Sequence, residues 1–283
     1  MASPTANRVL INTLPKSGTH LLSKAVEILG YHEHFDDPHA PNETPIFLNY
    51  REAKTAVARH NTGVSIEDRT IAVGTLVPFP VPLSIFHHWL EVMPLNRYIL
   101  GHITWNPDLA PLLSELEIAH IAIIRDPRAV VASLLAFILD TRGMPQPHFL
   151  EADFKLLSNR ERLDLLLNGG YAPEANVQIQ GFAAVYRAML AWQNEPDCLL
   201  IRFEDLIGSQ GGGSEQRQQQ TMIKIAQHLG CDVTSPMPTV YNSTARTFRQ
   251  GSIDSWKNSL DASTVDYLTD YCEPLCYEAG YWA

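Results

Sequence analysis

The chain has 283 residues, of which 45% are hydrophobic and 18% charged, and its formal net charge is −10. This balance is typical of a globular protein, and the length fits one α/β domain spanning residues 1–283. The negative charge argues against nucleic acid as a partner, because nucleic-acid binding needs clustered positive charge. No run approaches the roughly 18 apolar residues of a membrane span, and the N-terminus lacks the pattern of a secretion signal. We therefore expect a cytoplasmic location.

The first predicted element is a short buried strand at Val9–Thr13, which is followed directly by LPKSGTH. Residues 17–29 then show apolar side chains at helical spacing, and Gly30 is well placed to end that helix. The connecting stretch therefore lies where a strand turns into a helix. Amide groups at a helix N-terminus bind anions, so this position predicts a phosphate loop. The alternative is a turn whose serine or threonine only caps the helix.

The predicted phosphate loop consists of Lys16, Ser17, Gly18, Thr19 and His20. The lysine supplies a charge, the two hydroxyls supply donors, and the glycine allows a ligand to approach the backbone closely. The Walker A pattern is absent, because the chain contains no Gly-Lys dipeptide. A magnesium-dependent nucleotide kinase is therefore disfavoured.

The next segment, residues 31–97, is rich in proline and histidine and predicts irregular structure. Its stretch 75–90 is apolar, but three prolines argue against a central strand. We interpret this stretch as ordinary core or a lid, with a surface for a lipidic or acyl acceptor as the alternative. Tyr98–Ile103 predicts a second strand of the main sheet, and His102 lies near its end.

A third strand is predicted at Ile118–Arg125, which is almost entirely apolar, as expected for a strand buried on both faces of a parallel sheet. Arg125 ends this strand, where α/β proteins commonly bind ligands. Arg128 adds a second cation, and Ser133 adds a hydroxyl on the predicted helix 127–139. Arginine suits phosphate binding because its planar fork matches the phosphate oxygens. The alternative is an ion pair between Arg125 and a neighbouring carboxylate, Asp126 or Glu204.

The remaining chain continues the alternation of strands and helices. We predict loops and a short helix over 140–178, a helix over 179–193, a strand at Cys198–Phe203, a mobile surface loop at 208–220, and helices at 221–229 and 264–278. The alternation predicts a layered α/β fold with a central, mainly parallel sheet. The four cysteines and the histidine clusters show no metal-ligand spacing, so we expect packing roles and no metal site.

Four motifs together resemble the sulfotransferase family that uses 3′-phosphoadenosine 5′-phosphosulfate (PAPS). They are PKSGTH (15–20), RDPRAVVAS (125–133), RFEDL (202–206) and FRQG…WKN (248–258). The resemblance extends from about residue 9 to residue 258. It implies a three-layer α/β domain with a central, mainly parallel sheet and a strand–loop–helix phosphate-binding turn. It also implies 3′,5′-adenosine bisphosphate (PAP) as the product.

The resemblance also implies roles for individual residues. Lys16–His20 would bind the 5′-phosphosulfate, and Arg125 and Ser133 would bind the 3′-phosphate. Arg249, Gln250 and Gly251 would close over the 3′-phosphate, and Phe203 would lie beside the adenine. The chain departs from the family pattern at three positions: Leu21 replaces an aromatic residue that stacks on adenine, Gln250 replaces a common lysine, and His20 replaces a threonine or asparagine.

The family's general base corresponds to His102, and Lys16 would stabilise the leaving phosphate. Histidine can accept a proton from an alcohol at neutral pH, although a buried structural histidine is the alternative. If His102 is not the base, a carboxylate such as Glu33 or Glu43 is the next candidate. The acceptor is left open as a hydroxyl-bearing small molecule, lipid or acyl chain. Two other functions remain: sulfation of a β-hydroxyacyl chain followed by decarboxylation to an alkene, and a non-catalytic nucleotide-binding module.

Overall fold

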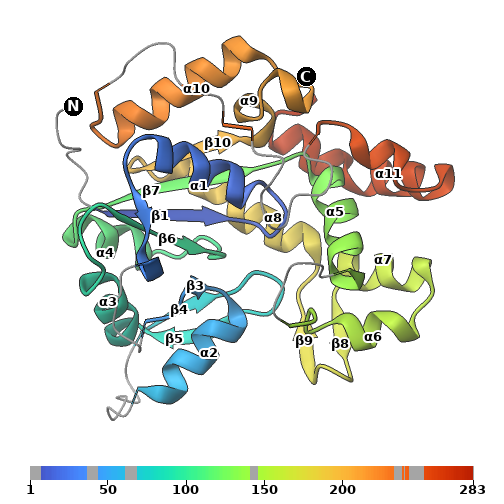
Figure 1. Cartoon of the computed structure of the whole chain (residues 1–283). Helices are drawn as coiled ribbons and strands as arrows, with labels where there is room; N and C mark the ends of the chain where they lie inside the picture. The colour runs from blue at the N-terminus through green and yellow to red at the C-terminus, as the bar shows by residue number, and fades with distance from the viewer. Residues whose placement is uncertain are drawn as a thin grey trace.

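The computed structural model describes residues 8–36, 44–60, 69–140, 146–232, 238, 240–241 and 252–282. A parallel sheet runs through its centre in the order β10–β7–β1–β6–β2, and β3 also pairs with β6 (Figure 1). These strands are β1 (Arg8–Thr13), β2 (His32–Glu33), β3 (Phe47–Leu48), β6 (Arg97–Gly101), β7 (Ile118–Ile124) and β10 (Cys198–Arg202). Strand β1 lies between β6 and β7 and pairs with both in parallel register.

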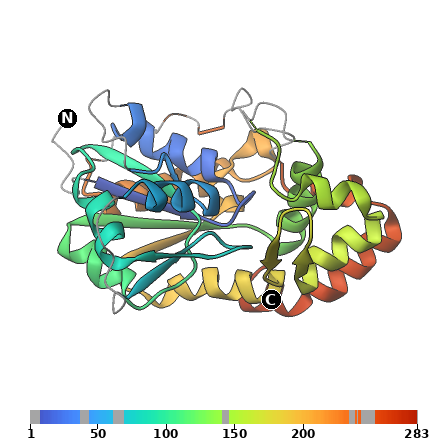
Figure 2. The ribbon, with the colours of Figure 1, turned by 90° about the horizontal axis from the view of Figure 1, so that it is seen from below.

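Helices cover both faces of the sheet because successive strand residues point to opposite sides. Val9 and Ile11 of β1 pack with α1 (Thr19–Ile28) and α10 (Glu215–His228). Leu10 belongs to a second core on the other face. The helices that contribute to that core include α3 (Leu83–Glu91), α4 (Leu109–Glu115), α5 (Pro127–Leu139), α8 (Phe182–Leu190) and α11 (Ala262–Glu278). Figure 2 shows the sheet between blue α1 and yellow α8. The predicted three-layer α/β class is therefore confirmed.

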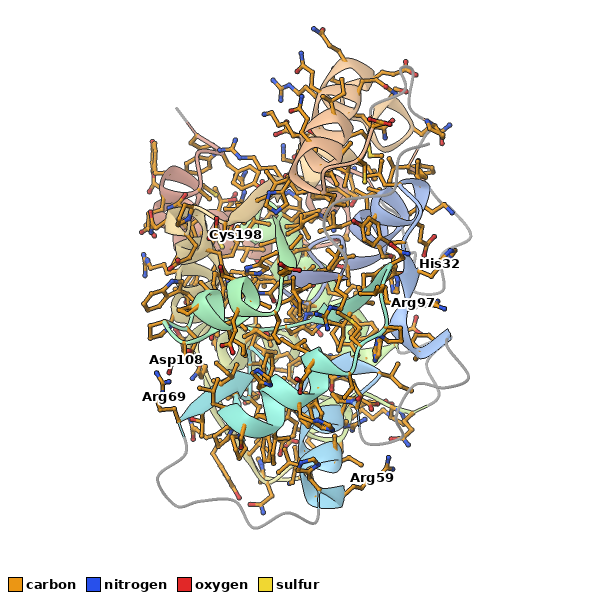
Figure 3. The ribbon with its side chains drawn as sticks, turned by 90° about the vertical axis from the view of Figure 1, so that its left-hand side faces the viewer. His32, Arg59, Arg69, Arg97, Asp108 and Cys198 are labelled. Atoms are coloured by element: carbon orange, nitrogen blue, oxygen red, sulfur yellow. The ribbon has the colours of Figure 1, made fainter. Side chains whose placement is uncertain are left out.

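Short elements outside the main sheet form two flanking units. One combines α2 (Tyr50–Arg59) with the antiparallel pair β4 (Thr70–Val73) and β5 (Phe79–Pro82). An ion pair between Arg69 and Asp108, both labelled in Figure 3, ties this unit to the residues before α4. The other unit combines α6 (Glu151–Leu156) and α7 (Asn159–Asn168) with the hairpin β8 (Gly170–Ala172) and β9 (Val177–Ile179).

The strands and helices around the phosphate motifs are predicted well, but three other segments differ. The segments 31–97 and 140–178 contain more regular structure than predicted, including α2, α3, α6 and α7. The loop predicted at 208–220 is wrong in its second half, because α10 begins at Glu215. Ser214 caps that helix by accepting a hydrogen bond from the Arg217 amide, and Met222 and Ile225 bury one face. The sequence prediction missed this helix start because the stretch is rich in glycine and glutamine, which obscured its apolar face.

The stretch 75–90 is mostly core. It contributes β5 and α3, and its buried side chains include Val81, Phe86 and Trp89. Strand β5 lies in the small antiparallel sheet and not in the central one, as its prolines predict. None of the helices within the described residues has the length and apolar character needed to span a membrane.

Candidate nucleotide and transfer site

Four of the predicted site residues lie at one edge of the central sheet. Because β1, β6, β7 and β10 are parallel, their carboxyl ends lie at the same edge. Lys16 follows β1, His102 follows β6, Arg125 follows β7 and Phe203 follows β10. Later strands of the chain lie on both sides of β1, with β6 on one side and β7 on the other. The strand order therefore reverses at β1, and open α/β sheets bind ligands at the carboxyl edge of such a switch point.

The β1–α1 loop has a backbone shaped for close approach. Lys16 has φ 70° and Gly18 has φ 114°, so two of its residues adopt left-handed conformations. The lysine conformation is uncommon for a non-glycine residue, and such strain is typical of functional sites. A Cβ atom on Gly18 would lie 2.8 Å from Cδ2 of Phe203 and 3.2 Å from Cδ1 of Ile123. Glycine is therefore required both by conformation and by space.

Two buried polar atoms at this edge are left without hydrogen-bond partners among the described residues. They are Oγ of Ser17, on the β1–α1 loop, and Nε of Arg125, at the end of β7. Buried polar groups are normally paired, because an unpaired group costs about 1–3 kcal/mol. An anionic ligand that accepts hydrogen bonds would satisfy both donors.

The guanidinium group of Arg125 is held by neutral partners. Its Nη1 donates to the Lys16 carbonyl at 3.3 Å, and its Nη2 donates to the Ser252 carbonyl at 3.1 Å. The Phe203 ring lies 4.3 Å from its Cζ, and the side chain is only 8% exposed. Burial lowers the pKa of Arg125, although Glu204 and Asp126 oppose this shift. A buried cation with an unused donor suits an anion.

The carboxylates near Arg125 are occupied by other donors, and neither forms an ion pair with Arg125 among the described residues. Glu204 accepts the Asp126 amide at 3.0 Å and the Tyr281 hydroxyl at 2.9 Å. The Asp126 carboxylate accepts hydrogen bonds from Nε and Nη2 of the Arg128 side chain, at 3.0 and 2.6 Å. The alternative of an Arg125 ion pair is therefore contradicted. Arg128, suggested as a second cation for the ligand, is committed to Asp126.

His102 is connected to the phosphate loop through Thr13. Its Nδ1 lies 2.7 Å from the Thr13 carbonyl, which can only accept, so Nδ1 carries the proton and Nε2 keeps a lone pair. Thr13 Oγ1 is 3.2 Å from the same nitrogen and 2.8 Å from Thr19 Oγ1 in the first turn of α1. Burial lowers the pKa of His102 to about 4, and the nearby His20 contributes to the decrease.

Aromatic rings adjoin both His102 and Lys16. The Phe47 ring of β3 lies 4.6 Å from the His102 ring, centroid to centroid. The ammonium group of Lys16 lies 4.4 Å from the centroid of Phe137 on α5, a cation–π geometry. Ser133 is half-buried one helical turn before Phe137, and its hydroxyl has no hydrogen bond to Arg125 within the described part of the chain.

Three of the predicted residues, Arg249, Gln250 and Gly251, lie outside the described residues. Phe203 is only 4% exposed and packs beneath Gly18 and Arg125, so its predicted place beside adenine stays a prediction. Sequence reasoning missed Thr13 and Phe47. The signal for Thr13 was a polar residue at the end of an apolar strand. Phe47 gave no signal, because the two-residue strand that carries it was not recognisable.

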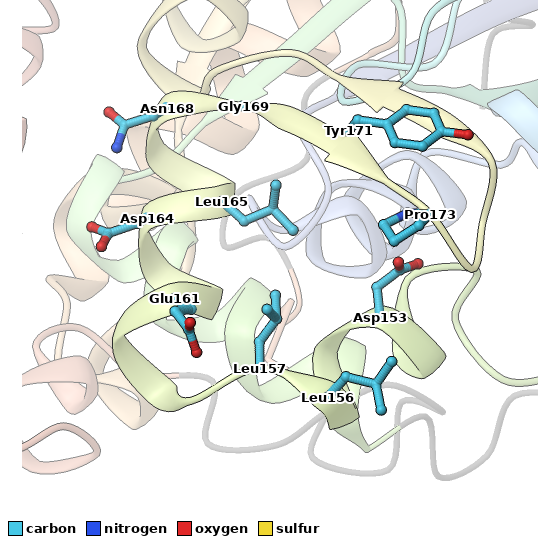
Figure 4. A pocket seen from close by; sticks show the side chains of 10 residues that line it. All are labelled: Asp153, Leu156, Leu157, Glu161, Asp164, Leu165, Asn168, Gly169, Tyr171 and Pro173. Carbon is cyan, nitrogen blue, oxygen red and sulfur yellow. The ribbon is translucent and has the colours of Figure 1, made fainter.

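A surface hollow of about 430 Å³ lies elsewhere, between α6, α7 and the β8–β9 hairpin (Figure 4). Its carboxylate Asp153 accepts hydrogen bonds from the backbone amides of Glu174 and Ala175 and so supports the hairpin turn. The hollow shares no residue with the sheet-edge site. It is therefore separate from the predicted transfer chemistry.

Comparison with known proteins identifies the family. The sulfotransferase domain matches residues 6–280, so the chain belongs to the sulfotransferase family, and its assignment to the PAPS-dependent sulfotransferases is confirmed. A solved structure of the mouse sulfotransferase SULT7A1 complexed with PAP is similar, with a TM-score of 0.52 and 16% identity, over 98% of this chain and 89% of that one. Retinol dehydratase in complex with androsterone and inactive cofactor PAP has a TM-score of 0.50 and 10% identity, over 95% and 80%. No curated protein sequence matches significantly.

Proposed function

We propose that this enzyme transfers the sulfuryl group of PAPS in line to a hydroxyl acceptor, with His102 as general base. One observation carries the proposal: Thr13 contacts both the His102 ring and Thr19 of the phosphate loop. The candidate base and the candidate anion site are thus joined through one residue. In-line transfer needs these two groups side by side, because the acceptor must approach the sulfur opposite the leaving phosphate.

The residues at the sheet edge fit the donor substrate. Ser17 and Arg125 each have a buried donor with no partner in the part of the chain that the structure describes, and the first turn of α1 presents amide groups with a partial positive charge. Lys16–His20 would hold the 5′-phosphosulfate, and Arg125 with Ser133 would hold the 3′-phosphate. Arg249, Gln250 and Gly251 are proposed to complete the 3′-phosphate site. The two similar structures both contain PAP, which supports a ligand of this kind.

The chemistry follows from these groups. The bound donor supplies an activated sulfuryl group. Lys16 and the α1 amides stabilise the negative charge that develops on the departing phosphate, without having to reorganise during the reaction. Nε2 of His102 takes the proton of the acceptor hydroxyl, while Nδ1 stays hydrogen-bonded to Thr13. No step requires a metal ion or a covalent enzyme intermediate.

The acceptor side favours an apolar molecule that carries the hydroxyl. Phe47 lines the His102 ring, and further aromatic contacts join Tyr50 to Phe79 and to Phe149 in the neighbouring elements. Androsterone, present in the retinol dehydratase structure, is such a molecule. Sulfation of a β-hydroxyacyl chain that then loses carbon dioxide remains the second candidate. The only support for this second candidate is the same group of aromatic side chains near His102.

Mass spectrometry of acceptor mixtures incubated with PAPS tests the proposal. We expect a gain of one sulfate on an apolar alcohol or phenol, unchanged by EDTA. An alkene in place of the sulfate ester would indicate the second candidate. Tight PAP binding without any transfer would indicate a non-catalytic nucleotide-binding module and would reject His102 as a base.

A further inference from the structure

The two arginines of the RDPR motif have opposite environments although they are three residues apart. Arg128 is fixed from several directions: Asp126 binds its Nε and Nη2, and its Cζ lies 5.0 Å from the Trp256 ring and 4.8 Å from the Trp282 ring. Arg125 keeps Nε without a partner among the described residues. The motif therefore contains one immobilised and one available guanidinium.

Asp126 is the group that would bind Arg125 if Arg128 were absent, and the two arginines would then no longer differ in availability. Its carboxylate is largely buried, and its charge acts on Arg125 as well as on Arg128. A buried carboxylate without a cation is strongly unfavourable, so it takes the nearest available positive group. Without Arg128, that group is Arg125, its neighbour in the chain. The other nearby carboxylate, Glu204, is already occupied by the Asp126 amide and Tyr281.

From this arrangement we infer that Arg128 is a positioning residue: it neutralises Asp126 and thereby leaves Arg125 available to a ligand phosphate. The two tryptophans hold Arg128 in its place on Asp126 by packing on its guanidinium group. Arg128 itself does not touch the nucleotide. The inference rests on the proposed function, because it assigns the phosphate to Arg125.

Calorimetric titration with PAP and with AMP tests this inference, because only PAP carries the 3′-phosphate. Arg128→Met keeps an apolar side chain between the tryptophans but removes the charge. We expect PAP affinity to fall about tenfold, the scale of one charge-assisted hydrogen bond, and AMP affinity to stay unchanged. Adding Asp126→Asn should restore the preference for PAP, because asparagine still caps α5 but no longer competes for Arg125.

If Arg128→Met does not fold, two more conservative substitutions of Arg128 can be compared with each other instead. Arg128→Lys retains a cation beside Asp126 and should keep the preference for PAP, whereas Arg128→Gln should lose it. Arg187→Met, which removes a surface ion pair with Glu278, is the matched control and should change neither affinity.

The outcomes separate the inference from the proposed function. An Arg128→Met variant that still prefers PAP overturns the inference, as does a double variant that remains as weak as Arg128→Met. Equal PAP affinities of the lysine and glutamine variants overturn it as well. A wild-type protein that does not prefer PAP would reject the proposed two-phosphate site itself, before any substitution is made.

Discussion

The donor half and the acceptor half of the site are built in different ways. The proposed donor half is built around the β1–α1 loop and Arg125, which directly follow the strands β1 and β7 of the central sheet. The acceptor half combines His102 with Phe47 of β3, whose backbone neighbour Leu48 accepts the His102 amide at 2.9 Å. The difference teaches that the proposed phosphate site is local, since its amides and cations come from short motifs. The proposed acceptor site depends instead on surfaces assembled from distant segments.

His102→Ala should give the largest effect and should act on the acceptor half alone. We expect transfer to an aliphatic alcohol to fall about 10²–10⁴-fold, the usual range for a lost general base. The decrease should be smaller for an acidic phenol, which is partly ionised without help. Rates over acceptors of graded acidity measure this, with exposed His32→Ala as the control. Equal slowing of all acceptors, or loss of PAP binding, would exclude His102 as the base.

Lys16→Met should act on the donor half and slow every acceptor by a similar factor. The expected decrease in kcat is about 10²–10³-fold, as for the removal of one group that stabilises developing charge. The same acceptor series measures it. Lys24→Met provides the control, because Lys24 lies on α1, the helix that follows the loop of Lys16, and pairs with Glu27 at the surface. A decrease that varies with acceptor acidity would contradict a role at the leaving group.

Arg125→Ala should separate the two proposed phosphate sites of the donor half, because it should affect only the binding of the 3′-phosphate. PAP binding should weaken by about 1.5–3 kcal/mol, the contribution of a charged hydrogen bond, while AMP binding should change little. Titration calorimetry with both nucleotides provides the measurement. If wild-type protein binds the two nucleotides equally, the assignment of a second phosphate site to Arg125 is wrong.

The pH dependence should show the smallest effect. In the proposed mechanism the active base is the neutral imidazole, and burial lowers the pKa of His102 to about 4. kcat/KM should therefore stay level as the pH falls from 8 to about 5, whereas an ordinary histidine with a pKa of about 6.5 would cause an earlier decline. A pH–rate profile checks this. A decline centred near pH 6.5 would mean that His102 is not desolvated in the free enzyme.

The sequence predicted the strands and the loop that carry the proposed donor half. The apolar strands at 9–13 and 118–125, the helix over residues 17–29 and the order of the motifs predicted a parallel sheet with ligand groups at its carboxyl edge. These features are readable because each depends on neighbours in the chain: strand periodicity, a left-handed glycine and the start of a helix.

The tertiary structure alone decided which of these groups are available. In the RDPR motif, Arg128 is bound to Asp126 and contacts two tryptophans from the C-terminal region, whereas Nε of Arg125 has no hydrogen-bond partner among the described residues. The contact of His102 with Thr13 and Phe47 is likewise non-local. Local sequence fixes backbone conformation and residue type, but burial, pairing and the pKa of each group depend on chain segments that meet only in the folded state.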